Sequence, residues 1–277
     1  MPNSIETNPS PASAKVPAAL RTLQILQLLA RASAPIPASS IATRLKIPRS
    51  SVYQLLEAVE AEGFVVHFPE ERRWGLGVAA FELGSAYLRH DPLERLAQPL
   101  LNRLLHQLAD YEVVGQLGIL SGTEVLYLLK GFSQRHLQAN RPVITEVGVR
   151  LPAHLTASGR SMLALFPRSQ FRAMYSGGAT ASLPLRTGFG PATSSALSEL
   201  LATERVAGFS AEHNMVTEGS SSVAVAATNH LGLPVAAFVV TFRTETMQLS
   251  EVQALVRLAA ELLKPVATEL SRRLGAK

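Results

Sequence analysis

Three helical patterns and a hairpin follow one another within the first third of the chain. The second and third helical patterns, 39–45 and 49–62, flank a tight turn at Lys46-Ile47-Pro48. Gly63 ends the third pattern, at the position where a left-handed residue commonly closes a helix. Two strand patterns around the polar turn 69–71 then complete a hairpin. This order of helix, helix, turn, helix and hairpin is that of a winged helix-turn-helix.

The third predicted helix turns its polar side chains outward and its apolar side chains inward. A helix that reads DNA needs donors on its first turn and outward face, where they reach base edges and phosphates. A helical pair with a solvated charged face would have the same pattern. The hairpin favours DNA binding, because it places Arg72 and Arg73 where a wing touches the DNA backbone or minor groove. The predicted DNA-binding residues are Ser39, Ser40, Arg44, Lys46, Arg49, Ser50, Ser51, Tyr53, Gln54, Arg72 and Arg73.

Composition limits the class of protein further. The chain has 277 residues, of which 47 % are apolar and 17 % are charged, and this is enough for one large or two ordinary domains. It contains no cysteine, which excludes disulfides, iron–sulfur clusters, thiolate zinc sites and cysteine nucleophiles and fits a reducing cytoplasm. The net charge of +5 is compatible with a polyanionic partner.

No segment of the sequence has the pattern of a signal peptide or of a membrane span. Residues 1–15 are rich in Pro, Ser, Ala and Asn, so we expect a disordered tail there. The most apolar window, 223–242, is interrupted by a turn cluster and therefore predicts a β-hairpin. We expect a cytoplasmic protein that has no membrane partner.

The chain is expected to divide into two domains. We predict the winged helix-turn-helix over 16–77, a linker helix over 78–91 and a second domain over 92–277. The predicted strands of the second domain are 113–120, 125–129, 209–215, 222–228 and 235–242, and its later helices are 155–166, 196–206 and 249–274. An antiparallel sheet with helices outside it is an α+β sensor-like domain.

Three stretches of the sequence resemble the IclR family of transcriptional regulators, in that family's order and spacing. Residues 36–66, IPASSIATRLKIPRSSVYQLLEAVEAEGFVV, are similar to its helix-turn-helix. Residues 147–167, VGVRLPAHLTASGRSMLALFP, are similar to its effector-domain signature, and residues 204–227, ERVAGFSAEHNMVTEGSSSVAVAA, to its late loop and strand. The resemblance covers about residues 16–277 and implies a ligand-responsive regulator with a GAF-like effector-binding domain. Lys46 stands where the family often has glycine.

The start of a predicted helix at Thr156, Ala157, Ser158 and Gly159 is the expected effector site. The first N–H groups of a helix lack partners within the helix, and small side chains let a ligand approach them. The residues alone favour an ordinary helix cap, but the resemblance implies binding, because members of the family bind small effectors at this helix start, facing the sheet. The further pocket positions that the resemblance implies are Glu212, Ser222, Val239 and Thr241.

The resemblance also bears on the kind of effector and on assembly. Val239 stands where relatives that take very small acids have a small polar residue. We therefore expect a partly apolar or aromatic acid, or a related carbonyl compound, and control of catabolic genes through it. We expect a homodimer, or a dimer of dimers, with two recognition helices in successive major grooves of pseudo-palindromic operator DNA.

Other chemistries lack their sequence signatures. The seven histidines show no HExxH-like spacing, no serine lies in a GxSxG motif, and no Walker loop is present. We therefore expect no metal, no cofactor and no enzymatic activity. Two alternatives stay open: a small-molecule-binding or enzymatic module whose helical appendage does not bind DNA, and an architectural DNA-binding protein that has no effector.

Overall fold

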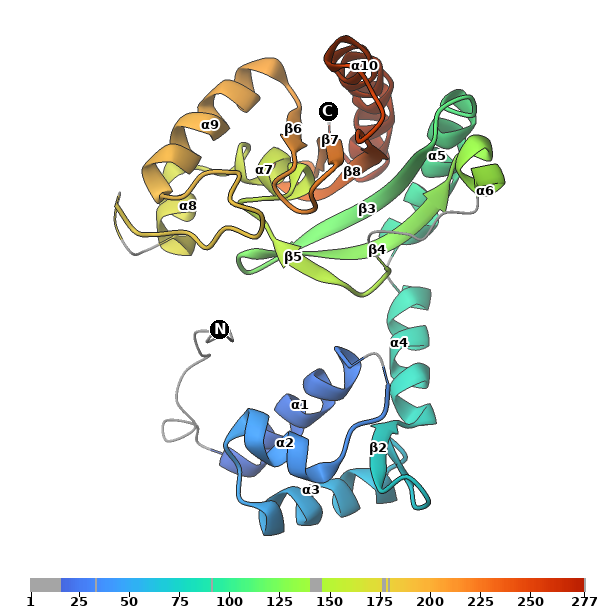
Figure 1. Ribbon diagram of the computed structural model, residues 1–277, viewed down its shortest axis with the longest axis vertical. Helices are drawn as coiled ribbons and strands as arrows, with labels where there is room; N and C mark the ends of the chain where they lie inside the picture. Colours follow the sequence, from blue (N-terminus) through green and yellow to red (C-terminus); the bar gives the residue numbers. More distant parts are fainter. Residues whose placement is uncertain are drawn as a thin grey trace. The chain divides into compact units, whose positions relative to one another are not determined.

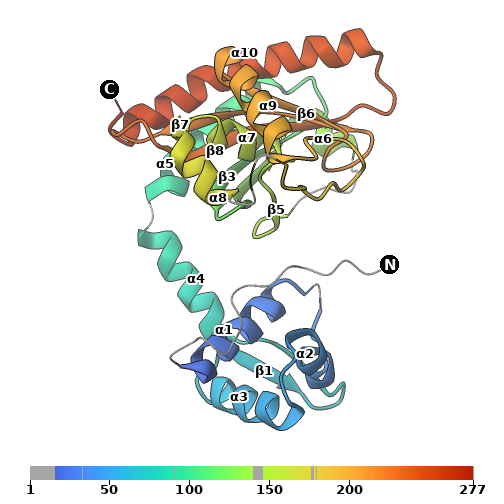
Figure 2. The ribbon, with the colours of Figure 1, turned by 90° about the vertical axis from the view of Figure 1, so that its left-hand side faces the viewer.

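The computed structural model describes residues 16–32, 34–90, 92–139, 146–175, 178 and 180–276. The predicted tail, 1–15, lies outside the described residues. Contacts within the chain divide it between residues 91 and 92 into two compact units, an amino-terminal unit and a carboxy-terminal unit (Figures 1 and 2).

The amino-terminal unit packs its helices and a hairpin around one apolar core. Its elements are α1 (Pro17–Ala30), α2 (Ala38–Leu45), α3 (Arg49–Ala61), β1 (Val65–Phe68), β2 (Arg73–Leu76) and α4 (Val78–His90). Ile25, Ile41 and Leu56 are fully buried in this core, together with Trp74 from the hairpin. Two backbone hydrogen bonds between Ile36 and Trp74 fasten the hairpin to the segment before α2. The winged helix-turn-helix predicted from the sequence is therefore present.

The turn between α2 and α3 uses a left-handed residue that is not glycine. Lys46 has φ 54° and ψ 43°, and its N–H donates to the carbonyl of Ala42 at the end of α2. A residue in this conformation closes one helix and lets the chain change direction before the next. Pro48 then precedes α3, so that α3 leaves the turn at a new angle.

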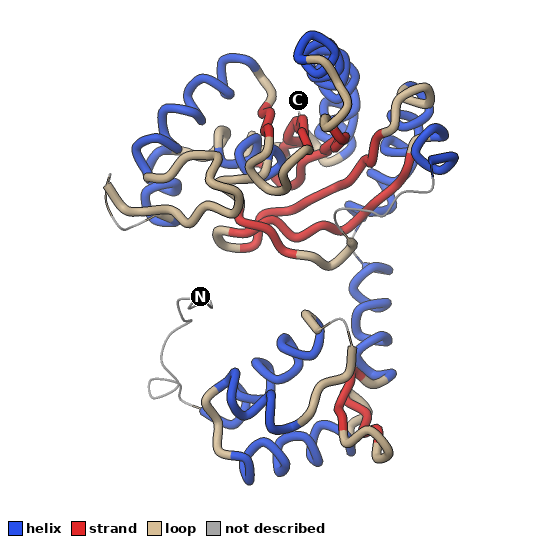
Figure 3. The backbone as a smooth tube through the Cα atoms, viewed as in Figure 1, coloured by secondary structure: helices blue, strands red, loops and turns tan. Residues whose placement is uncertain are grey.

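The carboxy-terminal unit is built on one antiparallel sheet (Figure 3). The strand order is β5-β4-β3-β8-β7-β6. Its strands are β3 (Val113–Ser121), β4 (Glu124–Phe132), β5 (Arg150–Pro152), β6 (Ser210–His213), β7 (Ser220–Thr228) and β8 (Pro234–Arg243). Its helices are α5 (Pro92–Gln107), α6 (Gln134–Ala139), α7 (Ala157–Leu163), α8 (Arg168–Met174), α9 (Ser194–Ala207) and α10 (Leu249–Arg273).

Alternation along the central strands gives the sheet two buried faces. Val223, Phe238 and Val240 point to the face that α5 and α10 cover. Ala224 and Val239 point to the opposite face, which α7 covers and to which α9 adds Leu197 and Leu201. This second face carries Glu212, Ser222 and Thr241, three of the polar side chains predicted to bind an effector.

The expected α+β architecture with an antiparallel, GAF-like sheet is confirmed, although several ends differ from the prediction. Helix α7 begins at Ala157, because Leu155 belongs to the preceding turn and donates its N–H to Pro152. Strand β6 stops at His213, because Asn214 adopts the left-handed conformation with φ 58°. Three short elements, α6, β5 and α8, were not predicted.

Candidate functional site

The recognition helix α3 presents its polar residues to solvent. Arg49, Tyr53 and Gln54 are exposed, whereas Val52 and Leu56 are buried. Among the other predicted DNA-binding residues, Arg44, Lys46, Ser50, Arg72 and Arg73 are exposed, and Ser39, Ser40 and Ser51 are half-buried. The cations lie around the start of α3, while Glu57, Glu60 and Glu62 lie towards its end. The end of the helix that enters the major groove in helix-turn-helix proteins is thus the cationic one.

The two arginines of the hairpin differ in their contacts. Arg72 is exposed at the tip and has a left-handed backbone, with φ 53°. Arg73 is also exposed, but its Nη1 donates to the carbonyl of Pro35 at 3.2 Å, and its Nε lies 3.9 Å from the Glu71 carboxylate. Arg73 therefore helps to fix the hairpin, a role that the sequence did not reveal.

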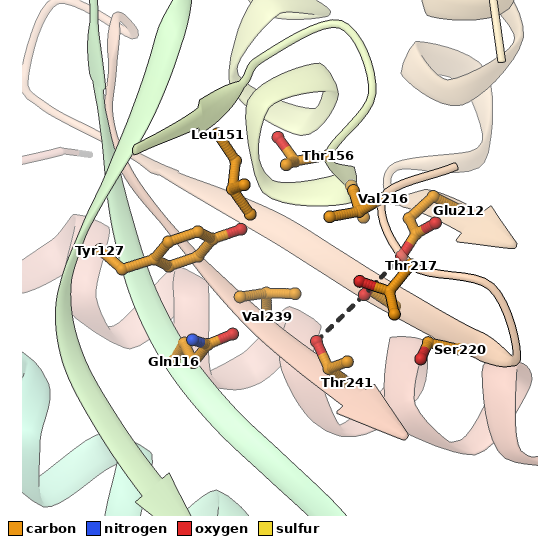
Figure 4. A pocket seen from close by; sticks show the side chains of 12 residues that line it. Gln116, Tyr127, Leu151, Thr156, Glu212, Val216, Thr217, Ser220, Val239 and Thr241 are labelled. Carbon is orange, nitrogen blue, oxygen red and sulfur yellow. Dashed lines mark hydrogen bonds between the residues drawn. The ribbon is translucent and has the colours of Figure 1, made fainter. Parts of the chain in front are cut away.

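A pocket lies on the sheet face that α7 covers (Figure 4). Its lining residues are Gln116, Tyr127, Leu151, Thr156, Ala157, Glu212, Val216, Thr217, Ser220, Ser222, Val239 and Thr241. Six of the eight residues predicted to bind an effector are among them: Thr156, Ala157, Glu212, Ser222, Val239 and Thr241. The space open to water-sized molecules is about 20 Å³, close to what one water needs. A larger ligand therefore requires side chains to move.

Three polar residues form a row across one wall of the pocket. Glu212 on β6 pairs with Ser222 on β7, which pairs with Thr241 on β8. The Ser222 hydroxyl donates to Glu212 Oε1 at 2.7 Å and lies 3.0 Å from the Thr241 hydroxyl. The N–H of Met215 donates to the other carboxylate oxygen at 3.0 Å. Burial raises the pKa of Glu212, and these hydrogen bonds to its carboxylate oppose that rise.

Two residues that the sequence analysis missed also line the pocket (Figure 4). Gln116 is 1 % exposed, and among the described residues its Nε2 has no hydrogen-bond partner. Tyr127 is buried with its hydroxyl 3.0 Å from the Ser158 hydroxyl, and burial raises the pKa of Tyr127 to about 12. For Gln116 the available signal was its polarity within the apolar run of β3. Tyr127 has no such signal, because aromatic residues are common in strands and β4 also contains Lys130.

The start of α7 combines a helix cap with the pocket wall. Thr156 accepts a hydrogen bond from the N–H of Gly159 at 3.1 Å, and Ala157 lines the pocket. Ser158 and Gly159 are not among the lining residues. Gly159 instead allows close packing, since an added Cβ would lie 2.3 Å from the carbonyl oxygen of Ala153. Ser158 faces Tyr127.

A buried ion pair anchors α7 behind the pocket. The guanidinium of Arg160 donates to both carboxylate oxygens of Glu204 on α9, at 3.0 and 3.1 Å. It also donates to the carbonyl of Leu155 at 2.9 Å and to that of Ala211 on β6 at 2.6 Å. Ser210 donates to Glu204 at 2.8 Å. Arg160 therefore ties α7 to α9 and to β6, the strand that carries Glu212.

The described part of the chain contains neither a candidate metal site nor a candidate membrane-spanning helix. Among the described residues, no group of three His, Asp or Glu side chains could hold a metal ion. None of the described helices combines the length and the apolar character that crossing a membrane requires.

The exposed cationic helix of a winged helix-turn-helix and a small polar–apolar pocket in an α+β unit define a ligand-responsive, DNA-binding regulator. The chain belongs to the IclR family of transcriptional regulators. The IclR helix-turn-helix domain matches residues 18–68, and the bacterial transcriptional regulator IclR C-terminal domain matches residues 85–272. The proteins of this family are regulators of transcription and not enzymes, as the sequence predicted.

Known relatives agree with this assignment. The chain is 34 % identical over 147 residues to the HTH-type transcriptional regulator BhcR of Paracoccus denitrificans, a match over 52 % of this chain and 49 % of that protein. The chain thus aligns with about half the length of BhcR. It is 26 % identical over 263 residues to the HTH-type transcriptional repressor AllR of Escherichia coli, covering 93 % and 90 % of the two chains.

The fold is shared with solved structures. One is that of an IclR homolog from Microbacterium hydrocarbonoxydans complexed with 4-hydroxybenzoate. It is 22 % identical, covers 93 % of this chain and 98 % of its own, and has a TM-score of 0.71.

Proposed function

We propose that this regulator binds pseudo-palindromic operator DNA as a homodimer, or as a dimer of dimers, and that a small effector in the pocket changes its affinity for that DNA. The proposed effector is a partly apolar or aromatic acid, or a related carbonyl compound, whose concentration controls catabolic genes. Because bacterial operator DNA lies in the cytoplasm, we propose that the protein acts there. Effector binding shifts the balance between two arrangements of the protein, by a coupling of typically 1–3 kcal/mol.

The observation that carries the effector proposal is the composition of the pocket. A hydrogen-bonded row of Glu212, Ser222 and Thr241 faces an apolar surface that includes Val239 and Leu151. Such a mixture of a few placed polar groups with apolar walls is typical of small-molecule sites. The complex of the Microbacterium relative with 4-hydroxybenzoate supports an aromatic acid as the first compound to test.

The DNA part of the proposal is tested at Arg49. Arg49→Ala is expected to weaken binding to the intergenic DNA beside the protein's own gene by about 1–3 kcal/mol if the side chain reads a base. If Arg49 contacts only a phosphate, binding weakens equally on all sequences and the salt slope falls by about one. Arg257→Ala, which removes an exposed arginine from α10, is the matched control. Unchanged affinity of the Arg49 variant in a fluorescence-anisotropy titration would refute both versions.

The effector part is tested with the same DNA and with 4-hydroxybenzoate and short aliphatic acids as probes. Ser222→Val leaves a polar atom of the ligand unpaired and is expected to cost about 1–3 kcal/mol of probe affinity. Val239→Ser is expected to favour smaller and more polar probes. Operator affinity that no probe alters would instead support an architectural protein. If Ser222→Val and Thr241→Val bind the probe as tightly as the parent does, the effector binds elsewhere.

A further inference from the structure

Gln116 is an anomaly within the carboxy-terminal unit. It lies in the middle of β3, in the apolar run VVGQLGIL, and is 1 % exposed. Its Nε2 has no hydrogen-bond partner among the described residues. Most buried polar groups in proteins are hydrogen-bonded, and an unpaired one destabilises the fold. A buried donor without an acceptor at a pocket wall therefore requires an explanation.

The register of the sheet places Gln116 beside the polar row. Gln116 lies opposite Val239 on β8, and Val114, two residues earlier on β3, lies opposite Thr241. Gln116 and Thr241 are therefore diagonal neighbours on one sheet face, a separation of roughly 7–8 Å that a ligand atom can bridge. Figure 4 shows Gln116 on the far side of Val239 from Glu212.

The polar side chains that line the pocket differ in whether their polar atoms have hydrogen-bond partners. Glu212 and Ser222 already satisfy one another, and Ser222 also contacts Thr241. Gln116 is the lining residue whose buried donor atom has no partner in the described structure. The lining residues include no Lys, Arg or His within the described part of the chain, whereas they do include the acid Glu212. The amide of Gln116 is thus a buried donor that is available there to recognise an oxygen atom of a ligand.

We propose that Gln116 is a specificity-determining residue whose Nε2 donates a hydrogen bond to an acceptor oxygen of the effector, from a carbonyl or a carboxylate group. The apolar part of the ligand then lies against Val239 and Leu151. This inference rests on the proposed function, because it takes the pocket to be the effector site. It adds a contact from β3 to those expected from α7, β6, β7 and β8.

The first test needs no ligand. Gln116→Met keeps the size of the side chain and removes the unpaired amide. In the full-length protein we expect the thermal transition of the carboxy-terminal unit, followed by circular dichroism, to rise by about 2–4 °C. Gln253→Met, the same change at an exposed position of α10, is the control and should leave the transition in place. A lower transition for Gln116→Met would overturn the proposal, because it would mean that the amide already has a partner.

The second test uses benzamide and benzoate, two probes of similar size that carry a neutral carbonyl and a carboxylate. Calorimetry on the full-length protein is expected to detect at least one of them at millimolar concentration, and the stronger probe identifies the acceptor. Gln116→Met should weaken that probe roughly tenfold, the effect of one hydrogen bond, and Gln253→Met should not. Equal affinity in parent and Gln116→Met, or binding of neither probe, would overturn the proposal.

The outcome for Gln116 is separable from that of the proposed function. If the parent binds DNA and responds to a probe while Gln116→Met binds the probe equally well, the regulator function stands and the role of Gln116 fails. If the parent binds no DNA, the proposed function fails whatever Gln116 does.

Discussion

The buried ion pair between Arg160 and Glu204 allows a quantitative prediction about the stability of the carboxy-terminal unit. Glu204→Leu leaves the guanidinium of Arg160, which is 0 % exposed, without its counter-ion. Removing one partner of a buried pair typically costs about 3–5 kcal/mol. Glu212 also attracts Arg160 electrostatically, and the carbonyls of Leu155 and Ala211 still accept from it, so we expect the lower part of that range. At a urea dependence of about 2 kcal/mol per molar, a loss of 3 kcal/mol lowers the unfolding midpoint by about 1.5 M.

The location of the only tryptophan makes the assay selective. Trp74 is buried in the core of the amino-terminal unit, whereas Arg160 and Glu204 lie in the carboxy-terminal unit. Urea unfolding of the full-length variant, followed by circular dichroism, should show the earlier midpoint of the carboxy-terminal unit. Tryptophan fluorescence, which reports on the amino-terminal unit, should change little, and it serves as the internal control.

A double variant separates the ion pair from general disruption of packing. Arg160→Met with Glu204→Leu removes both charges together, and buried pairs replaced by apolar residues often lose little stability. The carbonyls of Leu155 and Ala211 lose their donor in this variant, so some loss remains. The loss in the double variant should be smaller than the sum of the losses in the single variants Arg160→Met and Glu204→Leu, by at least about 2 kcal/mol. Additive losses, or a Glu204→Leu variant with the parent's midpoint, would refute this reasoning.

Three further predictions concern the wing, the acid and a packing glycine. Replacing Arg72 and Arg73 by alanine should weaken binding to every DNA sequence and lower the salt slope by about two, with circular dichroism confirming that the loss of the Pro35 contact leaves the fold intact. Because burial raises the pKa of Glu212, the folded state holds that proton more tightly than the unfolded chain does. The free energy of unfolding should therefore fall as the pH rises above the ordinary value of 4.5, and Glu212→Gln should remove this pH-dependent component in urea titrations. Gly159→Ala should lower stability by about 1–3 kcal/mol in a thermal melt, because the new Cβ meets backbone atoms of Ala153; a melt like the parent's would show that α7 can shift.

Much of the fold was predictable because its longer elements have sequence patterns that extend over many residues. Strands β7 and β8 are nine and ten residues long, and their apolar runs on either side of a turn cluster predict a hairpin. Strand β5 has only three residues, too few for a recognisable pattern. It is a strand because it pairs with β4, and the two segments meet only in the folded chain. Helix α8 has no buried residue, so no apolar stripe marks it.

The site was predictable only in part, for a related reason. Glu212, Ser222 and Thr241 were inferred from the resemblance, and the register brings all three to one row. Gln116 comes from a strand about a hundred residues away along the chain, and only the pairing of β3 with β8 makes it their neighbour. Gly159 was expected beside a ligand because it is small, but smallness also serves backbone packing, and the sequence does not distinguish the two uses.

Lys46, the left-handed residue of the turn between α2 and α3, affects both the stability of the fold and the proposed affinity for DNA. A residue with a Cβ at φ 54° is less stable than glycine there, by roughly 1 kcal/mol. Glycine at this position would relax the backbone and remove an exposed positive charge immediately before α3. In the proposed complex that charge lies near the phosphates, where each neutralised phosphate adds to the salt-dependent part of binding. Selection for tighter operator binding and selection for a more stable turn therefore act in opposite directions on Lys46.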